Sequence, residues 1–218
     1  MKKTILLYLI FSTFLLCING QKTLHIKNQK NYNYFDSFIL DSLNIRKPNY
    51  DVIDLQIRIS IWNAASGIHK VFIIEREKSG NWRGENFEFY YYNDDHHDFS
   101  KTISDKLILG KKWDSAFRTI VMRDYINLPS QKEVEKTISI SNKDSTGKLI
   151  MITADGTSYT YEFLTKRRKR KFTFKNPDSY YQFNKEQHND TKYFEMYMDL
   201  LTISKQALNL ETTLKVDK

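Results

Sequence analysis

Hydrophobic and polar residues alternate in short runs along the first half of the chain. The run that begins at Asp54 places Leu55, Ile57, Ile59 and Ile61 at every second position, and a period of two is that of a strand with one buried face. Turn-forming NAASG and KSGN segments separate this run from two further β-rich runs, which predicts an antiparallel meander. Strands are predicted at residues 54–61, 69–77, 82–92 and 101–109.

After these runs the hydrophobic period changes to that of a helix. Trp113, Phe117, Ile120 and Val121 stand at positions i, i+4, i+7 and i+8, which is one apolar stripe of an amphipathic helix. A helix is therefore predicted near residues 112–126.

A second helix is predicted near residues 191–208, where Asp190 or Thr191 can cap its first turn. Its apolar stripe is wide enough to pack on a sheet. A short helix is also predicted over residues 35–43. The stripe of the C-terminal helix comprises Phe194, Tyr197, Met198, Leu201 and Leu208.

The remaining alternating runs complete the predicted fold. Residues 135–141 (EKTISIS) and 171–175 return to a period of two, and residues 147–164 read as a hairpin around Asp155 and Gly156, which both tolerate positive φ. Strands in runs with two separated helices predict an α+β fold with a mainly antiparallel sheet of about six to eight strands.

The N-terminus has the pattern of a secretory signal peptide. Lys2 and Lys3 precede an uninterrupted, largely apolar run over residues 5–18, which is shorter than the roughly 20 residues of a membrane span. Cleavage after Gly20 would remove Cys17, which is the chain's one cysteine; lipidation of Cys17 is the alternative. The protein is therefore expected to be exported, to the periplasm, the outer surface or the medium, without a transmembrane span after cleavage.

The predicted organisation is a signal peptide over residues 1–20, an N-terminal lead-in over residues 21–50 rich in Asn, Lys and Tyr, and a single α+β domain over residues 51–218. Seven scattered glycines give no nucleotide-binding fingerprint, and no cofactor is expected.

The positive charge of the chain is concentrated at one place. The 34 Lys and Arg residues exceed the 26 Asp and Glu residues by 8, and removal of Lys2 and Lys3 leaves 32 against 26, or +6. Six consecutive cations equal that whole excess, so the rest of the mature chain sums to zero. They are Lys166, Arg167, Arg168, Lys169, Arg170 and Lys171.

This basic run stands between two predicted strands, so we expect it at the turn of a hairpin. In an exported protein its partner would be an anionic envelope component such as lipid phosphate or acidic polysaccharide, while nucleic acid is an unlikely partner outside the cytoplasm. A solvated turn whose charges keep the sheet edge from pairing is the other reading, and the pattern slightly favours it.

Other candidates for chemistry are sparse. Asp94, His96 and Asp98 would point the same way in an extended chain and are of the types that bind zinc, but no second cluster completes a site. Ser60, Ser66 and Ser115 lie in no GxSxG context, and His25, His69 and His188 are isolated in sequence. No catalytic residue is assigned.

The second half carries Asp155-Gly156, then Tyr159, Tyr161 and Glu162, followed by Asn176-Pro177 and a helix rich in Leu and Met. In these features it resembles small exported bacterial proteins of unknown function, over residues 113–208. The resemblance implies a shared fold and no activity.

Three functional readings follow from the sequence. The favoured one is a non-enzymatic binding or accessory protein of the bacterial envelope, whose partner is an anionic component or another exported protein. The second is a polyanion- or membrane-surface-binding module that uses residues 166–171, and the third is a small exported hydrolase.

Overall fold

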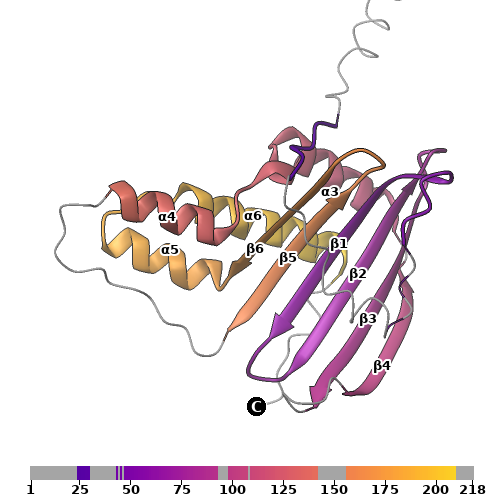
Figure 1. Ribbon diagram of the computed structural model, residues 1–218, viewed down its shortest axis with the longest axis horizontal. Coiled ribbons are helices and arrows are strands. Elements are labelled where there is room, and N and C mark those ends of the chain that lie inside the picture. The colour runs from indigo at the N-terminus through magenta and orange to yellow at the C-terminus, as the bar shows by residue number, and fades with distance from the viewer. Residues whose placement is uncertain are drawn as a thin grey trace, which may run out of the picture.

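The chain folds around one six-stranded antiparallel sheet with helices on one of its faces (Figure 1). The computed structural model describes residues 24–29, 43, 45, 47–92, 98–107, 109–141 and 156–209. The strands are β1 (Ile53–Asn63), β2 (Ile68–Glu77), β3 (Trp82–Tyr92), β4 (Asp98–Leu107), β5 (Thr157–Leu164) and β6 (Lys169–Lys175). Their spatial order is β4-β3-β2-β1-β5-β6, and the α+β prediction is confirmed.

Strands β1 to β4 form the predicted meander, and β1 lies near the centre of the sheet. It pairs antiparallel with β2 on one side and with β5 on the other, with Ile59 opposite both Phe72 and Tyr161. Gly67 and Gly80, in the two turns that flank β2, have φ of 64° and 91°, which other residues adopt only with strain.

The helices form two groups. One group lies between β4 and β5 in the chain, and the other follows β6. The first group is α3 (Lys111–Met122), the short 3₁₀ helix η1 (Tyr125–Asn127) and α4 (Gln131–Ser141); the second is α5 (Pro177–Glu186) and α6 (Lys192–Ala207). The predicted helices near 112–126 and 191–208 correspond to α3 and α6. None of the described helices has the length and apolar character of a membrane span.

The main core lies between the sheet and these helices. Leu55, Ile57 and Ile59 of β1 are each at most 1% exposed and face this core. Aromatic rings join the sheet to α6: Tyr159 stacks on Phe174 at 5.4 Å, and Phe174 stacks on Tyr197 at 4.5 Å. Such stacked pairs add to the free energy gained by burial alone.

The opposite face of the sheet carries a smaller apolar cluster. Val71 and Ile73 of β2 pack with Phe87 and Phe89 of β3, beneath Leu43. Ile45 packs against the same cluster. Part of the N-terminal lead-in therefore covers the face of the sheet that the helices leave open.

Helix α4 corrects the prediction of a strand over residues 135–141, which was wrong. The backbone N–H of Ser130 donates to the Glu133 carboxylate at 2.6 Å, and the N–H of Glu133 donates to the Ser130 carbonyl at 2.9 Å. A Ser-x-x-Glu sequence of this kind starts a helix. Val134, four residues after that start, is 4% exposed and belongs to the main core.

Helix α5 was not predicted from the sequence, although Pro177 at its first position and Asp178 in its first turn are typical of a helix start. The strand predicted before Gly156, with its two-residue turn, and most of the helix predicted over residues 35–43 lie outside the described residues.

Candidate anion-binding surface at the β5–β6 turn

The six consecutive cations are divided between a turn and the start of a strand. The turn runs from Thr165 to Arg168, whose backbone carbonyl accepts from the Thr165 N–H at 2.8 Å and from its hydroxyl at 3.0 Å. The N–H of Arg168 donates to the Thr165 hydroxyl at 3.0 Å. Thr165 therefore fixes the turn, and Lys169 to Lys171 begin β6.

Two of the cations, Arg170 and Lys171, form ion pairs within the fold. The Arg170 guanidinium donates to the Leu128 carbonyl at 2.6 Å and lies 3.9 Å from the Glu133 carboxylate. The Lys171 ammonium lies 3.7 Å from the carboxylate of Glu162, which is 1% exposed. These two side chains link β6 to the start of α4 and to the interior of the sheet, so they contribute to stability.

The backbone of the basic run binds the N-terminal segment over residues 24–29. The N–H of Gln29 donates to the Lys169 carbonyl at 3.0 Å, and the Gln29 side-chain oxygen accepts from the Lys171 N–H at 3.0 Å. The Asn28 side-chain oxygen accepts from the Lys169 N–H at 3.3 Å. Further along β6, Gln131 accepts from the N–H of Lys175 at 2.7 Å.

Asn127 fixes the same segment from the helical side. Its side-chain oxygen accepts from the Lys27 N–H at 2.7 Å, and its side-chain nitrogen donates to the His25 carbonyl at 2.8 Å. Between them, Ile26 is 1% exposed and belongs to the main core. Its carbonyl accepts from the Arg168 guanidinium at 3.2 Å. The chain next to the predicted signal peptide is thus anchored beside the basic turn.

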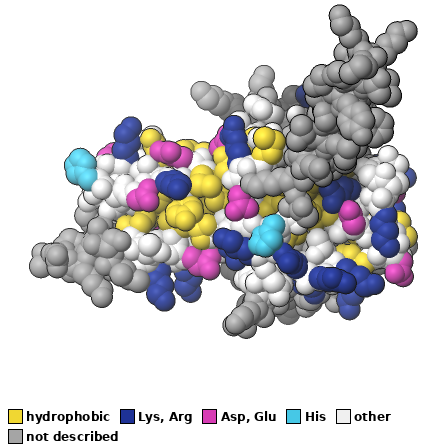
Figure 2. Space-filling model, turned by 90° about the horizontal axis from the view of Figure 1, so that it is seen from above, with side chains coloured by type: hydrophobic (Ala, Val, Ile, Leu, Met, Phe, Trp, Pro, Cys, Tyr) yellow, Lys and Arg dark blue, Asp and Glu magenta, His cyan; other side chains and the backbone are white. Residues whose placement is uncertain are grey.

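Lys166, Arg167 and Arg168 remain as exposed cations at the turn. Within the described ranges, no carboxylate forms an ion pair with any of the three. Figure 2 looks from above onto the end of the molecule where this turn lies, and Lys and Arg side chains gather over the sheet half of that view with scattered acidic side chains among them. The surface can attract an anion by charge.

A second polar group lies on the sheet face opposite the helices, and it is buried. Arg58 of β1 and Glu162 of β5 stand opposite each other, 3% and 1% exposed, with 3.7 Å between Nη1 and Oε2. Arg58 also donates to the Gln56 side chain at 2.8 Å, which in turn donates to Glu75 at 2.8 Å. The alternation along β1 predicted that Gln56 and Arg58 lie on its polar face. It did not predict that they are buried or that Arg58 pairs with Glu162.

Ser60 and His69, isolated in sequence, meet on this face across β1 and β2, with 2.6 Å between Oγ and Nε2. Both are 6% exposed. Burial lowers the pKa of His69 to about 4, so the imidazole is neutral at pH 7. A neutral His beside Ser is the chemistry of an activated nucleophile. Both residues are buried, whereas a substrate must reach both atoms, and neither residue lines the groove between α3 and α6 or the pocket beside α4.

The metal candidates are only partly covered by the structure. Asp94 and His96 lie outside the described residues, and Asp98 is the first residue of β4. Among the residues that are described, no cluster of His, Cys, Asp and Glu has a geometry that could hold a metal ion.

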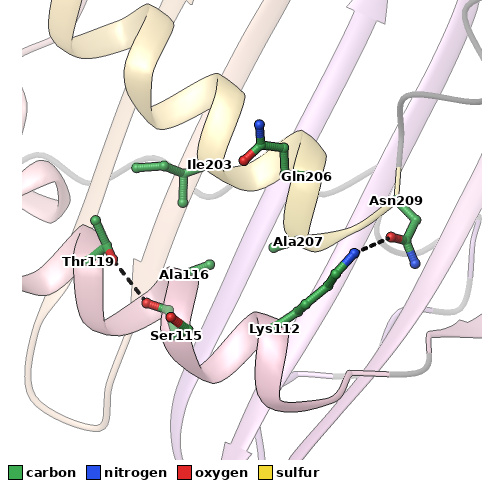
Figure 3. A pocket seen from close by; sticks show the side chains of 8 residues that line it. All are labelled: Lys112, Ser115, Ala116, Thr119, Ile203, Gln206, Ala207 and Asn209. Carbon is green, nitrogen blue, oxygen red and sulfur yellow. Dashed lines mark hydrogen bonds between the residues drawn. The ribbon is translucent and has the colours of Figure 1, made fainter.

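An open groove of about 730 Å³ separates α3 from α6 (Figure 3). Its walls are made by Lys112, Ser115, Ala116, Thr119, Ile203, Gln206, Ala207 and Asn209. The Lys112 ammonium donates to the Asn209 side chain at 3.5 Å across one end. A smaller pocket of about 170 Å³ lies where α4 meets the α5–α6 turn, and it contains His188 and Asp190. Neither brings together the groups of a hydrolytic site.

Comparison with protein-family models, with curated proteins and with solved structures finds no match to this chain.

Proposed function

We propose that this chain is a non-enzymatic accessory protein of the bacterial envelope, and that its β5–β6 turn binds an anionic membrane surface. One observation carries the proposal: residues 24–29 are anchored beside the turn, at the same end of the domain as the exposed Lys166, Arg167 and Arg168. The segment that follows the predicted export signal therefore lies at the same end of the molecule as the exposed cations.

The distance along the chain supports this orientation. The apolar run ends at Ile18, six positions before Leu24, and six residues span at most about 22 Å. While the signal is in the membrane, the turn is held close to the lipid headgroups. A lipid on Cys17 would keep it there, whereas a chain cleaved after Gly20 would depend on the cations alone.

The expected attraction is moderate and sensitive to salt. Each cation at an anionic surface contributes about 1 kcal/mol, so three contribute roughly 3 kcal/mol. Screening by salt weakens exposed charges over about 10 Å at 0.1 M. The cleaved protein should therefore bind reversibly, and dissociate when the salt concentration rises.

The test measures binding of the purified exported chain to vesicles of zwitterionic lipid with and without phosphatidylglycerol. The double variant Lys166→Ser with Arg167→Ser should bind anionic vesicles about 30-fold more weakly, because two cations are lost. Lys185→Ser with Lys192→Ser removes the same charge from exposed positions around the α5–α6 turn and should bind like the original chain.

Equal weakening in the two double variants would contradict the proposal, since net charge alone would then explain the binding. Retention on a soluble acidic polysaccharide without binding to anionic vesicles would also contradict it, and would assign the turn to a carbohydrate partner. Far-ultraviolet circular dichroism of each variant checks that the fold is unchanged.

A further inference from the structure

A row of three side chains crosses the sheet at the end of the strands remote from the β5–β6 turn (Figure 1). Trp62 of β1 stands opposite Ser158 of β5, and Ser158 stands opposite Lys175 of β6. Residues directly opposite each other in antiparallel strands lie on the same face of the sheet. Ile61, which precedes Trp62, packs against the main core on the helical side. Trp62 and its row therefore lie on the face opposite the helices.

The functional groups of this row are accessible and unused. Of the Trp, Tyr and Phe side chains that the structure describes, Trp62 is the only exposed one, at 40%. Lys175 is exposed and Ser158 is half-buried. Among the described residues, nothing forms a ring contact with Trp62, a hydrogen bond with the Ser158 hydroxyl or an ion pair with the Lys175 ammonium. The row thus presents an aromatic ring, a hydroxyl and a positive charge.

A second row of hydroxyls lies beside the first on the same face. Thr160 of β5 stands opposite Thr173 of β6, and their hydroxyl oxygens are 2.9 Å apart. Both residues are half-buried, and each hydroxyl has one donor and two lone pairs, so neither is used up by this one bond. Neighbouring strands lie about 4.8 Å apart, so the first row extends about 10 Å from β1 to β6. The two rows together form a polar strip with one exposed ring at its end.

We propose that this strip binds an acidic polysaccharide, one whose pyranose rings carry carboxylates. The C–H face of a pyranose ring is apolar and packs on an indole, whose face is the negative side of its quadrupole. Sugar hydroxyls can donate to and accept from the hydroxyl of Ser158. A carboxylate on the next ring accepts a charge-assisted hydrogen bond from Lys175. The length of the strip matches two linked rings, one on Trp62 and one beside Lys175.

Other classes of partner fit this strip less well. Binding by insertion into lipid, or to an apolar protein surface, requires a group of exposed apolar side chains, whereas Trp62 is the one that this strip presents. Nucleic acid requires several cations along its backbone. Lys171 lies on the same face, but its ammonium is 3.7 Å from the Glu162 carboxylate. The exposed charge of Lys175 therefore complements carboxylates that are spaced along a chain.

The strip is separate from the β5–β6 turn that is proposed to bind membranes. Ser158 and Leu164 are six positions apart in β5, which is about 20 Å along a strand. Salt screens exposed charges over about 8 Å at physiological ionic strength. Substitutions at the turn should therefore leave binding at the strip unchanged, so failure of either proposal can be distinguished from failure of the other.

The test is calorimetric titration of the purified chain at about 0.15 M salt. The acidic probe is a hexamer of galacturonic acid, and the uncharged probe is a hexamer of glucose. Trp62→Ala should weaken binding of the acidic hexamer about tenfold or more, and Trp62→Phe, which keeps a smaller ring, should weaken it less. Lys175→Ser should weaken the acidic hexamer about two- to fivefold and leave the uncharged hexamer unchanged.

Two variants elsewhere on the surface are the matched controls. Met122→Ala removes an apolar side chain that is 70% exposed at the end of α3, and Lys185→Ser removes an exposed cation from α5. Both should bind the acidic hexamer like the original chain. The double variant Lys166→Ser with Arg167→Ser should also bind it normally, which separates the strip from the turn. Thermal unfolding of each variant confirms that it is folded.

Quenching of tryptophan fluorescence by acrylamide gives a second readout. A bound acidic hexamer should shield Trp62, and this shielding should be absent in Trp62→Ala. The proposal is overturned if the acidic hexamer does not bind, if Trp62→Ala binds it as well as the original chain does, or if binding leaves the quenching unchanged. Equal affinity for the two hexamers, or a loss in Lys185→Ser as large as in Lys175→Ser, also overturns it.

Discussion

The side-chain amide of Asn176 fills the space that a Cβ atom at Gly156 would need. Such a Cβ would stand 2.0 Å from the Asn176 amide nitrogen. Asn176 has φ of 36°, its side-chain oxygen accepts from the Thr157 N–H at 2.8 Å, and its own N–H donates to the Thr157 carbonyl at 3.1 Å. One residue thus closes the end of the β5–β6 ladder and precedes α5.

Gly156→Ala should therefore lower the free energy of unfolding by about 1–3 kcal/mol, the usual cost of forcing an extra carbon into a packed site. Asn176→Gly in the same chain should recover part of that loss, because it removes the obstructing amide and tolerates the positive φ. Denaturant titration of the two single variants and the double variant gives the coupling free energy. A coupling near zero would contradict this account.

The buried pair of Arg58 and Glu162 predicts a second, asymmetric result. Glu162→Leu leaves the Arg58 charge in a site that is 3% exposed, with Gln56 as its hydrogen-bond acceptor, and should cost about 3–5 kcal/mol. Arg58→Met combined with Glu162→Leu removes both charges and should recover most of the loss. Lys171, with a side chain 27% exposed, can turn to solvent when Glu162 is replaced. The measurement is chemical unfolding; a double variant no more stable than Glu162→Leu would disprove it.

His69 should make stability depend on pH below neutrality. Its folded pKa is about 4 because burial disfavours the charged ring, while an exposed histidine has about 6.5. Above pH 6.5 both states are neutral and stability is complete. Between pH 6.5 and 4 the unfolded state binds a proton that the folded state does not, so stability falls by about 3 kcal/mol in total.

His69→Gln can keep a hydrogen bond to Ser60 and should remove this step. The quantity to compare is the difference in unfolding free energy between the original and the variant chain at several pH values from 4 to 7. A constant difference across that range would mean that His69 titrates alike in both states.

Single substitutions in the basic run should show two classes of cation: those whose loss lowers the stability of the fold and those whose loss does not. Arg170→Ala removes a charged donor from the Leu128 carbonyl and should cost roughly 1.5–3 kcal/mol. Lys166→Ala, at an exposed position, should change stability by less than about 0.5 kcal/mol. Thermal unfolding of the two variants is sufficient, and equal effects would contradict the division.

Periodicity was a good guide where one face of an element is buried. The alternation of Leu55, Ile57 and Ile59 predicted β1, and the Trp113 and Phe117 spacing predicted α3, because in each case the buried side chains form the main core. The strand predicted over residues 135–141 was wrong because a run of seven residues with a few alternating apolar positions is too short to distinguish a strand from a helix. The Ser130–Glu133 pair that starts the helix lies before residue 135, outside the run from which the prediction was made.

The sequence predicted only part of the candidate surface, namely the position of its basic run. Charge counting located the basic run, but nothing local to it predicted that Arg170 binds Leu128 or that Gln29 binds Lys171, because these partners are separated by 42 and 142 positions. Ser60 and His69 are close only because β2 returns alongside β1. The export signal, the envelope location and the function of the turn remain predictions.

The docking of residues 24–29 on β6 also determines an order of events during synthesis. Asn28 and Gln29 leave the ribosome long before Lys169 and Lys171, the residues to which they bind. Their closure is a contact of very high sequence separation, which is slow and cannot precede the strand that receives it. Docking of residues 24–29 is therefore a late step in folding, which cannot occur until the residues of β6 have been synthesised and have joined the sheet.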